Sequence, residues 1–144
     1  MDDVVREALR RNDRYVLEVV EAFNLCPFAR GARTSGRSVR EVFLDESLDL
    51  DRLRAVVLRY EREAPEAEVF QWIFPRAGES PEALDAVVVA LRPCTEVFAF
   101  AAFHPGFRCD PSTPDALVPF FRKTPDPTVQ AVRRSVLDGL AREG

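Results

Sequence analysis

A single histidine and the lack of any long apolar run set the first limits on this chain of 144 residues. A transmembrane helix needs about 18 or more consecutive apolar residues, and no stretch of the sequence supplies them. The acidic opening segment, MDDVVREALRR, also lacks the apolar centre of a secretory signal. We therefore expect a protein without a membrane partner.

Cysteines and basic residues are also too few for two other classes of protein. Three cysteines are an odd number, which fits a reducing cytoplasm better than a disulfide framework. None of them forms a Cys-x-x-Cys pair, and one histidine cannot complete a conventional zinc site alone. A net charge of −4 argues against a nucleic-acid partner, which would require a basic surface. We expect a cytoplasmic protein, and the sequence leaves a homo-oligomer open.

The composition that remains is that of a folded domain. Hydrophobic residues make up 47% and charged residues 31% of the chain. The length suits one domain, spanning 1–144, that can bury a core without disulfides or a structural metal.

Helical and strand-like patterns alternate along the chain. Apolar residues recur at helical spacing in three segments, 3–23, 50–60 and 80–91. Three shorter β-rich segments lie at 39–44, 67–74 and 95–103. A last helix is expected to begin at Asp126–Pro127, since an apolar stripe follows that pair. This stripe comprises Val129, Val132, Val136, Leu137 and Leu140.

Alternating strands and helices favour parallel strand pairing. We therefore predict an α/β fold, a small single-domain three-layer sandwich with a mostly parallel sheet of about three core strands flanked by helices. The unbroken apolar run TEVFAFAAF, at 95–103, is typical of a strand covered on both faces. We place this strand in the interior of the sheet.

His104 directly follows this strand, and open parallel sheets bind ligands beyond the carboxyl ends of their strands. An imidazole can exchange a proton near pH 7 or bind a metal. A hydrogen-bonded structural histidine is an equal alternative. Three carboxylates could orient the ring, namely Asp45, Glu46 and Asp110. Three cations could bind an anionic substrate, namely Arg76, Arg108 and Lys123.

Cys26 lies in NLCPFARGARTSGRS, residues 24–38, where the first helical pattern stops. It is either a buried packing residue or a nucleophile or ligand. In the second case Arg30 and Arg33 would favour the thiolate and bind an anion. A helix running antiparallel to the first strand would start Cys26 at the sheet edge opposite His104. The 14-residue loop is long enough to cross.

The two other thiols receive different interpretations. Cys109 is closer to His104 in sequence and competes with Cys26 for the site. Cys94 follows Pro93 at an amino end of the sheet, so we expect it to be structural.

Three blocks, NLCPFA at 24–29, FHPGF at 103–107 and KTPDP at 123–127, together resemble a bacterial domain-of-unknown-function family, number 1415. The resemblance covers nearly the whole chain and carries no activity with it. It favours Cys26 over Cys109. The positions that match its signature are Asn24, Cys26, Pro27, Phe28, His104 and Pro105.

The chain departs from the family pattern in its last block. Similar chains tend toward Asn-Arg-Ser/Ala-Pro where this one has Arg122, Lys123 and Thr124 before the proline. They carry a histidine where this one has Gln130. Asn24 belongs to the matching part and is counted among the substrate-binding candidates. Any role of that second histidine would be lost or altered here.

These observations support three hypotheses of different classes. The first is an enzyme acting on a small, anionic molecule, with Cys26 as nucleophile or ligand and His104 as acid/base or ligand. The second is a haem- or metal-binding protein that uses Cys26, His104 or both, because a Cys-Pro pair can present a thiolate to haem iron. The third is a non-catalytic ligand-binding or interaction domain in which both residues are structural.

Overall fold

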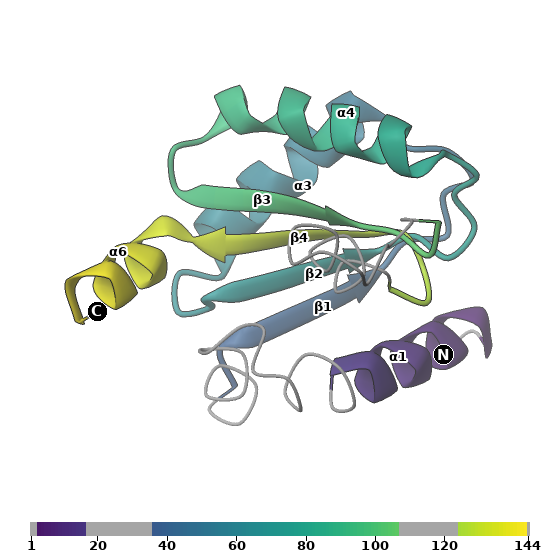
Figure 1. Cartoon of the computed structure of the whole chain (residues 1–144), viewed down its shortest axis with the longest axis horizontal. Helices are drawn as coiled ribbons and strands as arrows, with labels where there is room; N and C mark the ends of the chain where they lie inside the picture. The colour runs from purple at the N-terminus through teal and green to yellow at the C-terminus, as the bar shows by residue number, and fades with distance from the viewer. Residues whose placement is uncertain (1–2, 17–35, 107–123, 144) are drawn as a thin grey trace, which may run out of the picture.

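The computed structural model describes residues 3–16, 36–106 and 124–143 (Figure 1). The elements in chain order are α1 (Asp3–Tyr15), β1 (Ser38–Val42), α3 (Leu50–Glu63), β2 (Val69–Ile73), α4 (Pro81–Leu91), the 3-10 turn η2 (Arg92–Cys94), β3 (Phe98–Phe103), β4 (Thr128–Arg133) and α6 (Arg134–Glu143). Within these ranges no helix combines the length and the apolar character that crossing a membrane requires.

The sheet has four strands in the order β1-β2-β4-β3. β1 pairs with β2 in parallel, whereas β4 is antiparallel to both β2 and β3. The chain is therefore an α/β protein with a mixed sheet, and the prediction of a mostly parallel sheet of three strands was wrong. β1, β2 and β3 do run in one direction, as helix-connected strands should, but the fourth strand lies between two of them.

The prediction of a helix starting at Asp126–Pro127 was wrong, because residues 128–133 form the strand β4. Val129 and Val132, three residues apart, were read as one helical stripe. In the strand they lie on opposite faces: Val129 joins the main core, and Val132 packs against Val69 and Val136. Both faces of β4 are covered, so its apolar residues do not alternate simply. The helix begins at Arg134 instead.

β3 is an edge strand, so the prediction that 95–103 lies inside the sheet was also wrong. Its apolar run has a different cause. Phe98, Phe100 and Ala102 point into the core, while the alternate positions carry two alanines and Phe103. The insertion of β4 from later in the chain removes β3's direct contact with β2, and no local pattern in 95–103 signals this.

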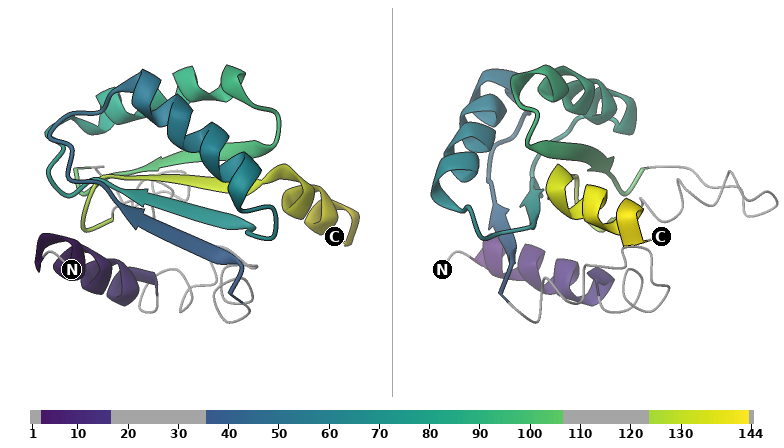
Figure 2. Two further views of the ribbon diagram at one scale, coloured as in Figure 1. Left: turned by 180° about the vertical axis from the view of Figure 1, so that it is seen from behind. Right: turned by 90° about the vertical axis from the view of Figure 1, so that its left-hand side faces the viewer.

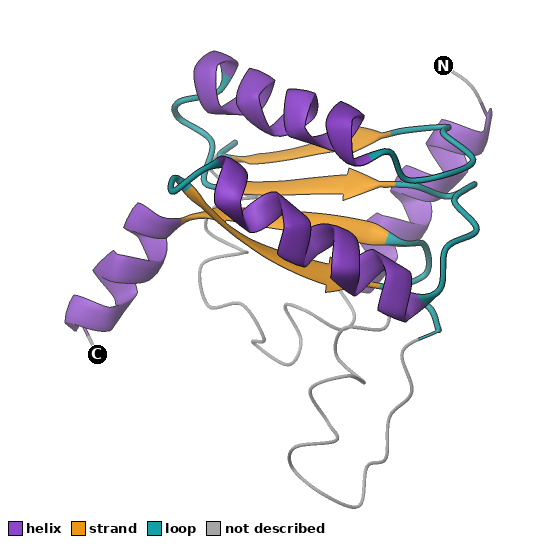
Figure 3. Ribbon diagram, turned by 90° about the horizontal axis from the view of Figure 1, so that it is seen from above, coloured by secondary structure: helices purple, strands orange, loops and turns teal. Residues whose placement is uncertain are grey.

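Helices cover the two faces of the sheet unequally. α3 and α4 lie together on one face, whereas α1 lies on the other beside β1 (Figures 1 and 2). Seen from above, α3 and α4 lie across the strands, and α6 extends from the end of β4 beyond the sheet (Figure 3). The carboxyl ends of β1, β2 and β3 lie together at one end of the sheet, where the strands stop. This end, which is distinct from the side of the sheet formed by an edge strand, is called here the carboxyl edge.

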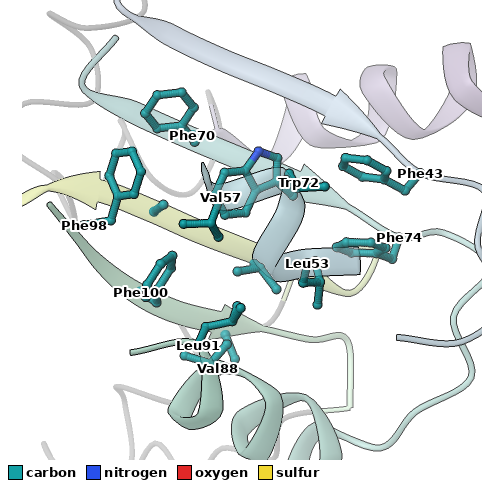
Figure 4. Close-up of a cluster of buried hydrophobic side chains, with 14 of the residues drawn as sticks. Phe43, Leu53, Val57, Phe70, Trp72, Phe74, Val88, Leu91, Phe98 and Phe100 are labelled. Carbon is teal, nitrogen blue, oxygen red and sulfur yellow. The ribbon is translucent and has the colours of Figure 1, made fainter. Parts of the chain in front are cut away.

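The main core lies between the sheet and the pair α3 and α4 (Figure 4). Phe70 and Phe98 make an edge-on contact with ring centroids 5.2 Å apart, although their strands are separated by β4. Trp72 is fully buried and stacks with Tyr60 of α3 at 5.9 Å. Such aromatic contacts add to the stabilisation from buried area and fix the height of the helices above the sheet.

α1, α3 and α4 confirm the sequence prediction where they are described. Asp49 caps α3 by accepting hydrogen bonds from two backbone N–H groups of its first turn. Ser80 Oγ accepts from Ala83 N at 3.1 Å and Pro81 occupies the first helical position of α4. Both caps place helix N-termini at the carboxyl edge. α1 is helical to Tyr15, and the predicted remainder, 17–23, lies outside the described residues.

Candidate functional site

His104 lies at the carboxyl edge, directly after β3, as the sequence predicted. Its Nδ1 is 2.8 Å from Gly106 N, and its Nε2 is 2.8 Å from the main-chain oxygen of Glu79. Since Gly106 N–H can only donate, Nδ1 must carry a lone pair, and the ring proton lies on Nε2. The arrangement therefore selects a neutral imidazole in one tautomer.

Glu79 connects this histidine to the neighbouring loops. Its Oε1 accepts a hydrogen bond of 2.6 Å from the N–H of Leu48, which lies in the loop after β1. Beside it, Gly78 N–H donates to Glu46 O at 3.4 Å. The second carboxylate oxygen of Glu79, Oε2, is buried and has no hydrogen-bond partner among the residues that the structure describes. The sequence places Glu79 among the residues that follow the second strand but gives it no role, because its link to His104 runs through a main-chain carbonyl.

Tight packing surrounds the turn after His104. A Cβ atom placed on Gly106 would lie 3.0 Å from Pro81 Cγ and 3.1 Å from His104 Nδ1. Few real Cβ atoms approach other atoms so closely, so a larger residue here would force Pro81 or the imidazole to shift by a few tenths of an ångström. The Pro105–Gly106 turn is therefore fitted against both the imidazole and the start of α4.

The other predicted residues of the strand ends have separate surroundings. Asp45 forms an ion pair with Arg52 of α3, with Arg52 Nη2 3.2 Å from Asp45 Oδ1. Glu46 and Arg76 are exposed side chains on the loops after β1 and β2. Their predicted roles around His104 stay predictions.

Most of the residues predicted for the site lie outside the described ranges. They comprise the thiols Cys26 and Cys109, the orienting carboxylate Asp110, and five substrate-binding candidates, Asn24, Arg30, Arg33, Arg108 and Lys123. The distance from Cys26 to His104 is therefore still a prediction. Cys94, in contrast, is described: it packs partly buried against the main core, and burial raises the pKa of its thiol. A raised pKa suits a packing cysteine better than a reactive one.

A second polar cluster joins α1 to the start of β4. Arg11 Nε lies 3.0 Å from Asp126 Oδ2, and Arg11 Nη2 lies 3.2 Å from Oδ1. The hydroxyls of Thr124 and Thr128 both donate to the main-chain oxygen of Asp126, at 2.6 and 3.0 Å. Asp126 was expected to cap a helix and instead anchors α1. Its partner is 115 residues away, so no sequence pattern pointed to the pair.

On the α1 face of the sheet, polar residues occupy one row. Arg40 of β1 donates to Asn12 Oδ1 at 3.2 Å and pairs with Asp13, both on α1. In register beside it are Gln71 and then Gln130, the residue that stands where similar chains have histidine. Gln130 thus lies on a covered strand within the sheet, whereas the sequence placed it on a helix.

No group of three or more His, Cys, Asp or Glu side chains within ranges 3–16, 36–106 and 124–143 could hold a metal ion. Comparison with protein-family models, curated proteins and solved structures finds no match to this chain. Any functional argument therefore depends on the geometry of the chain itself.

Proposed function

We propose that the chain is an enzyme acting on a small, anionic molecule at the carboxyl edge. In this proposal Cys26 is nucleophile or ligand, and His104 is acid/base or ligand. The observation that carries it is the pair of contacts at His104, a strand-end ring whose Nε2 lies 2.8 Å from the main-chain oxygen of Glu79 and whose Nδ1 lies 2.8 Å from Gly106 N.

This arrangement suits proton transfer through Nδ1. A ring that donates Nε2–H to a fixed acceptor is oriented, and the resulting imidazolium is stabilised by that same bond. The Nδ1 lone pair can accept a proton from a thiol, which leaves a thiolate nucleophile. Gly106 N–H, which now donates to Nδ1, would turn away when the proton arrives.

The resemblance to family 1415 supports the choice of Cys26 as the partner thiol. It pairs NLCPF with FHP, and we propose on that basis that the chain is a member of the family. Arg30 and Arg33, which follow Cys26 closely in sequence, supply the positive charge that favours a thiolate and an anionic substrate.

Alkylation of the three cysteines by iodoacetamide across a pH series tests the proposal. Cys26 should react at lower pH than Cys94, whose buried thiol has a raised pKa and serves as the internal reference. His104→Gln should slow the alkylation of Cys26 while leaving the alkylation rate of Cys94 unchanged. The proposal would be rejected if Cys26 showed the pH dependence of an ordinary thiol and the same alkylation rate in the His104→Gln variant. A haem absorbance band or a stoichiometric metal in fresh protein would point to a ligand role instead.

A non-catalytic role is the second candidate, and one observation favours it. Both ring nitrogens of His104 already take part in local hydrogen bonds, which join the Pro105–Gly106 turn to the loop before α4. In that case His104→Gln would lower the free energy of unfolding without changing the reactivity of any thiol.

A further inference from the structure

Glu79 is the residue through which three strand-end loops are joined. It lies between β2 and α4, its side chain accepts from Leu48 after β1, and its carbonyl accepts from His104 after β3. The side chain therefore fixes the loop, and the main chain of the same residue holds the imidazole.

The carboxylate of Glu79 has two acceptor oxygens, although the hydrogen bond from Leu48 N–H requires only one. Its Oε2 is buried, and within ranges 3–16, 36–106 and 124–143 it has no hydrogen-bond partner, an arrangement that costs free energy. A residue with a single acceptor atom could bind Leu48 N–H equally well. Stability alone thus gives no reason for a glutamate here, although its charge is favoured by the N-terminus of α4, which starts two residues later.

We propose that Glu79 is a positioning residue for His104. Its side chain holds the loop so that its carbonyl keeps the ring proton on Nε2 and makes Nδ1 the reacting or ligating atom. The part assigned to Nδ1 rests on the proposed function. The hydrogen-bond arrangement itself does not.

The opposite tautomer would be disfavoured at both ring atoms. A lone pair on Nε2 would face the carbonyl oxygen of Glu79, and an N–H on Nδ1 would face the N–H of Gly106. Both contacts would be repulsive. A reacting group must therefore approach Nδ1 from the side of the Pro105–Gly106 turn, and displace the N–H of Gly106.

Nitrogen-15 NMR of the imidazole tests this directly, because His104 is the only histidine in the chain. The wild-type protein should show a protonated Nε2 and an unprotonated Nδ1. Glu79→Ala removes the bond to Leu48, so the ratio of the two tautomers should fall by about two- to tenfold, the range expected for one hydrogen bond. Glu79→Gln keeps an acceptor for Leu48 N–H and should retain most of the wild-type ratio.

Glu82→Ala is the matched control. It removes a carboxylate from the first turn of α4, three residues after Glu79, and Glu82 has no part in the proposed site, so the tautomer ratio should not change. A folded Glu79→Ala protein with the wild-type ratio would overturn the positioning role. An equal shift in Glu82→Ala would overturn it too, since charge would then set the tautomer.

Two further results keep the proposal separate from the proposed function. A wild-type protein with its proton on Nδ1 would overturn the positioning role even if Glu79→Ala failed to fold. If Cys26 is alkylated like an ordinary thiol while the tautomer ratios are as expected, the thiol–imidazole enzyme is rejected. The control of the ring proton by Glu79 would still be supported.

Discussion

The two tyrosines of the chain differ in their surroundings but share a raised pKa. Burial raises the pKa of Tyr15 to about 12. Burial raises that of Tyr60 to about 12 as well, with a further contribution from its hydrogen bond to Glu41. The folded state thus favours both neutral phenols. Unfolded tyrosines ionise near pH 10, so this contribution to stability is full below pH 10 and is lost as the pH rises through 12.

We predict that phenolate absorbance of the native protein will rise near pH 12 for both tyrosines, and near pH 10 after denaturation. Tyr60→Phe should remove half of the native signal without moving the other half. Titration near pH 10 in protein that circular dichroism shows to be folded would contradict the burial of these side chains.

Gly106 offers a second test with a control in the same sheet edge. We predict that Gly106→Ala lowers the free energy of unfolding by about 1–3 kcal/mol, because its Cβ would press on Pro81 and His104. Gly78→Ala adds its Cβ to open space and should change it by less than about 0.5 kcal/mol. Urea titration measures both. Equal effects would show that the packing around the turn is looser than described.

Residue type predicted part of the candidate site and missed the rest. His104 was found because a histidine after an apolar strand is conspicuous in sequence. Glu79 could be placed after the second strand but its role could not be predicted, since any residue type could supply the carbonyl that binds the ring. Every residue has a main-chain carbonyl, so residue type does not show which carbonyl binds a side chain. The direction of the carbonyl depends on the conformation of the loop.

At the scale of elements, local signals predicted the helices well and the strand order poorly. Ser80–Pro81 specifies the start of α4 through contacts within one turn, so the sequence contains the whole argument. β4 was misread because Asp126–Pro127 also looks like a helix start and because valines three apart fit a helical stripe. Its true partners, β2 and β3, are distant in sequence, and pairing over such separations is invisible to local patterns.

The contact between α1 and β4 can be tested through Asp126. The carboxylate is 11% exposed and its partner Arg11 42% exposed, so the pair is partly shielded from water. We predict that Asp126→Asn lowers the free energy of unfolding by about 1 kcal/mol, less than for a fully buried pair because Arg11 can reach solvent. Hydrogen exchange should also quicken in α1 ahead of the sheet.

The exposed pair Glu7–Arg10 on the same helix provides the control. Glu7→Gln should leave both stability and α1 exchange nearly unchanged, since exposed pairs contribute little. Unchanged exchange in Asp126→Asn would mean that α1 is held mainly by other contacts, such as those of Arg40.

At the scale of the whole molecule, one core joins α3 and α4 to all four strands. Trp72, the only tryptophan, is fully buried at its centre and reports on its integrity. We predict that tryptophan fluorescence and far-ultraviolet circular dichroism give coincident urea transitions, as expected for cooperative unfolding. Leu53 lies deep in the same core. Leu53→Ala should move both curves together to lower urea concentration, with a loss of about 2–5 kcal/mol in the free energy of unfolding. Separated transitions would indicate that the core breaks up in parts.

The position of β4 also bears on the order in which the protein can be made. β2 and β3 leave the ribosome well before residues 128–133, yet they have no direct contact as strands and are joined only through β4. A nascent chain that lacks β4 leaves one edge of β2 and both edges of β3 unpaired, with Phe70 and Phe98 unable to meet across the gap. The sheet must therefore wait for its central strand, and folding of this core follows synthesis of β4. Until then, the unpaired strands are the surfaces that a chaperone would need to shield.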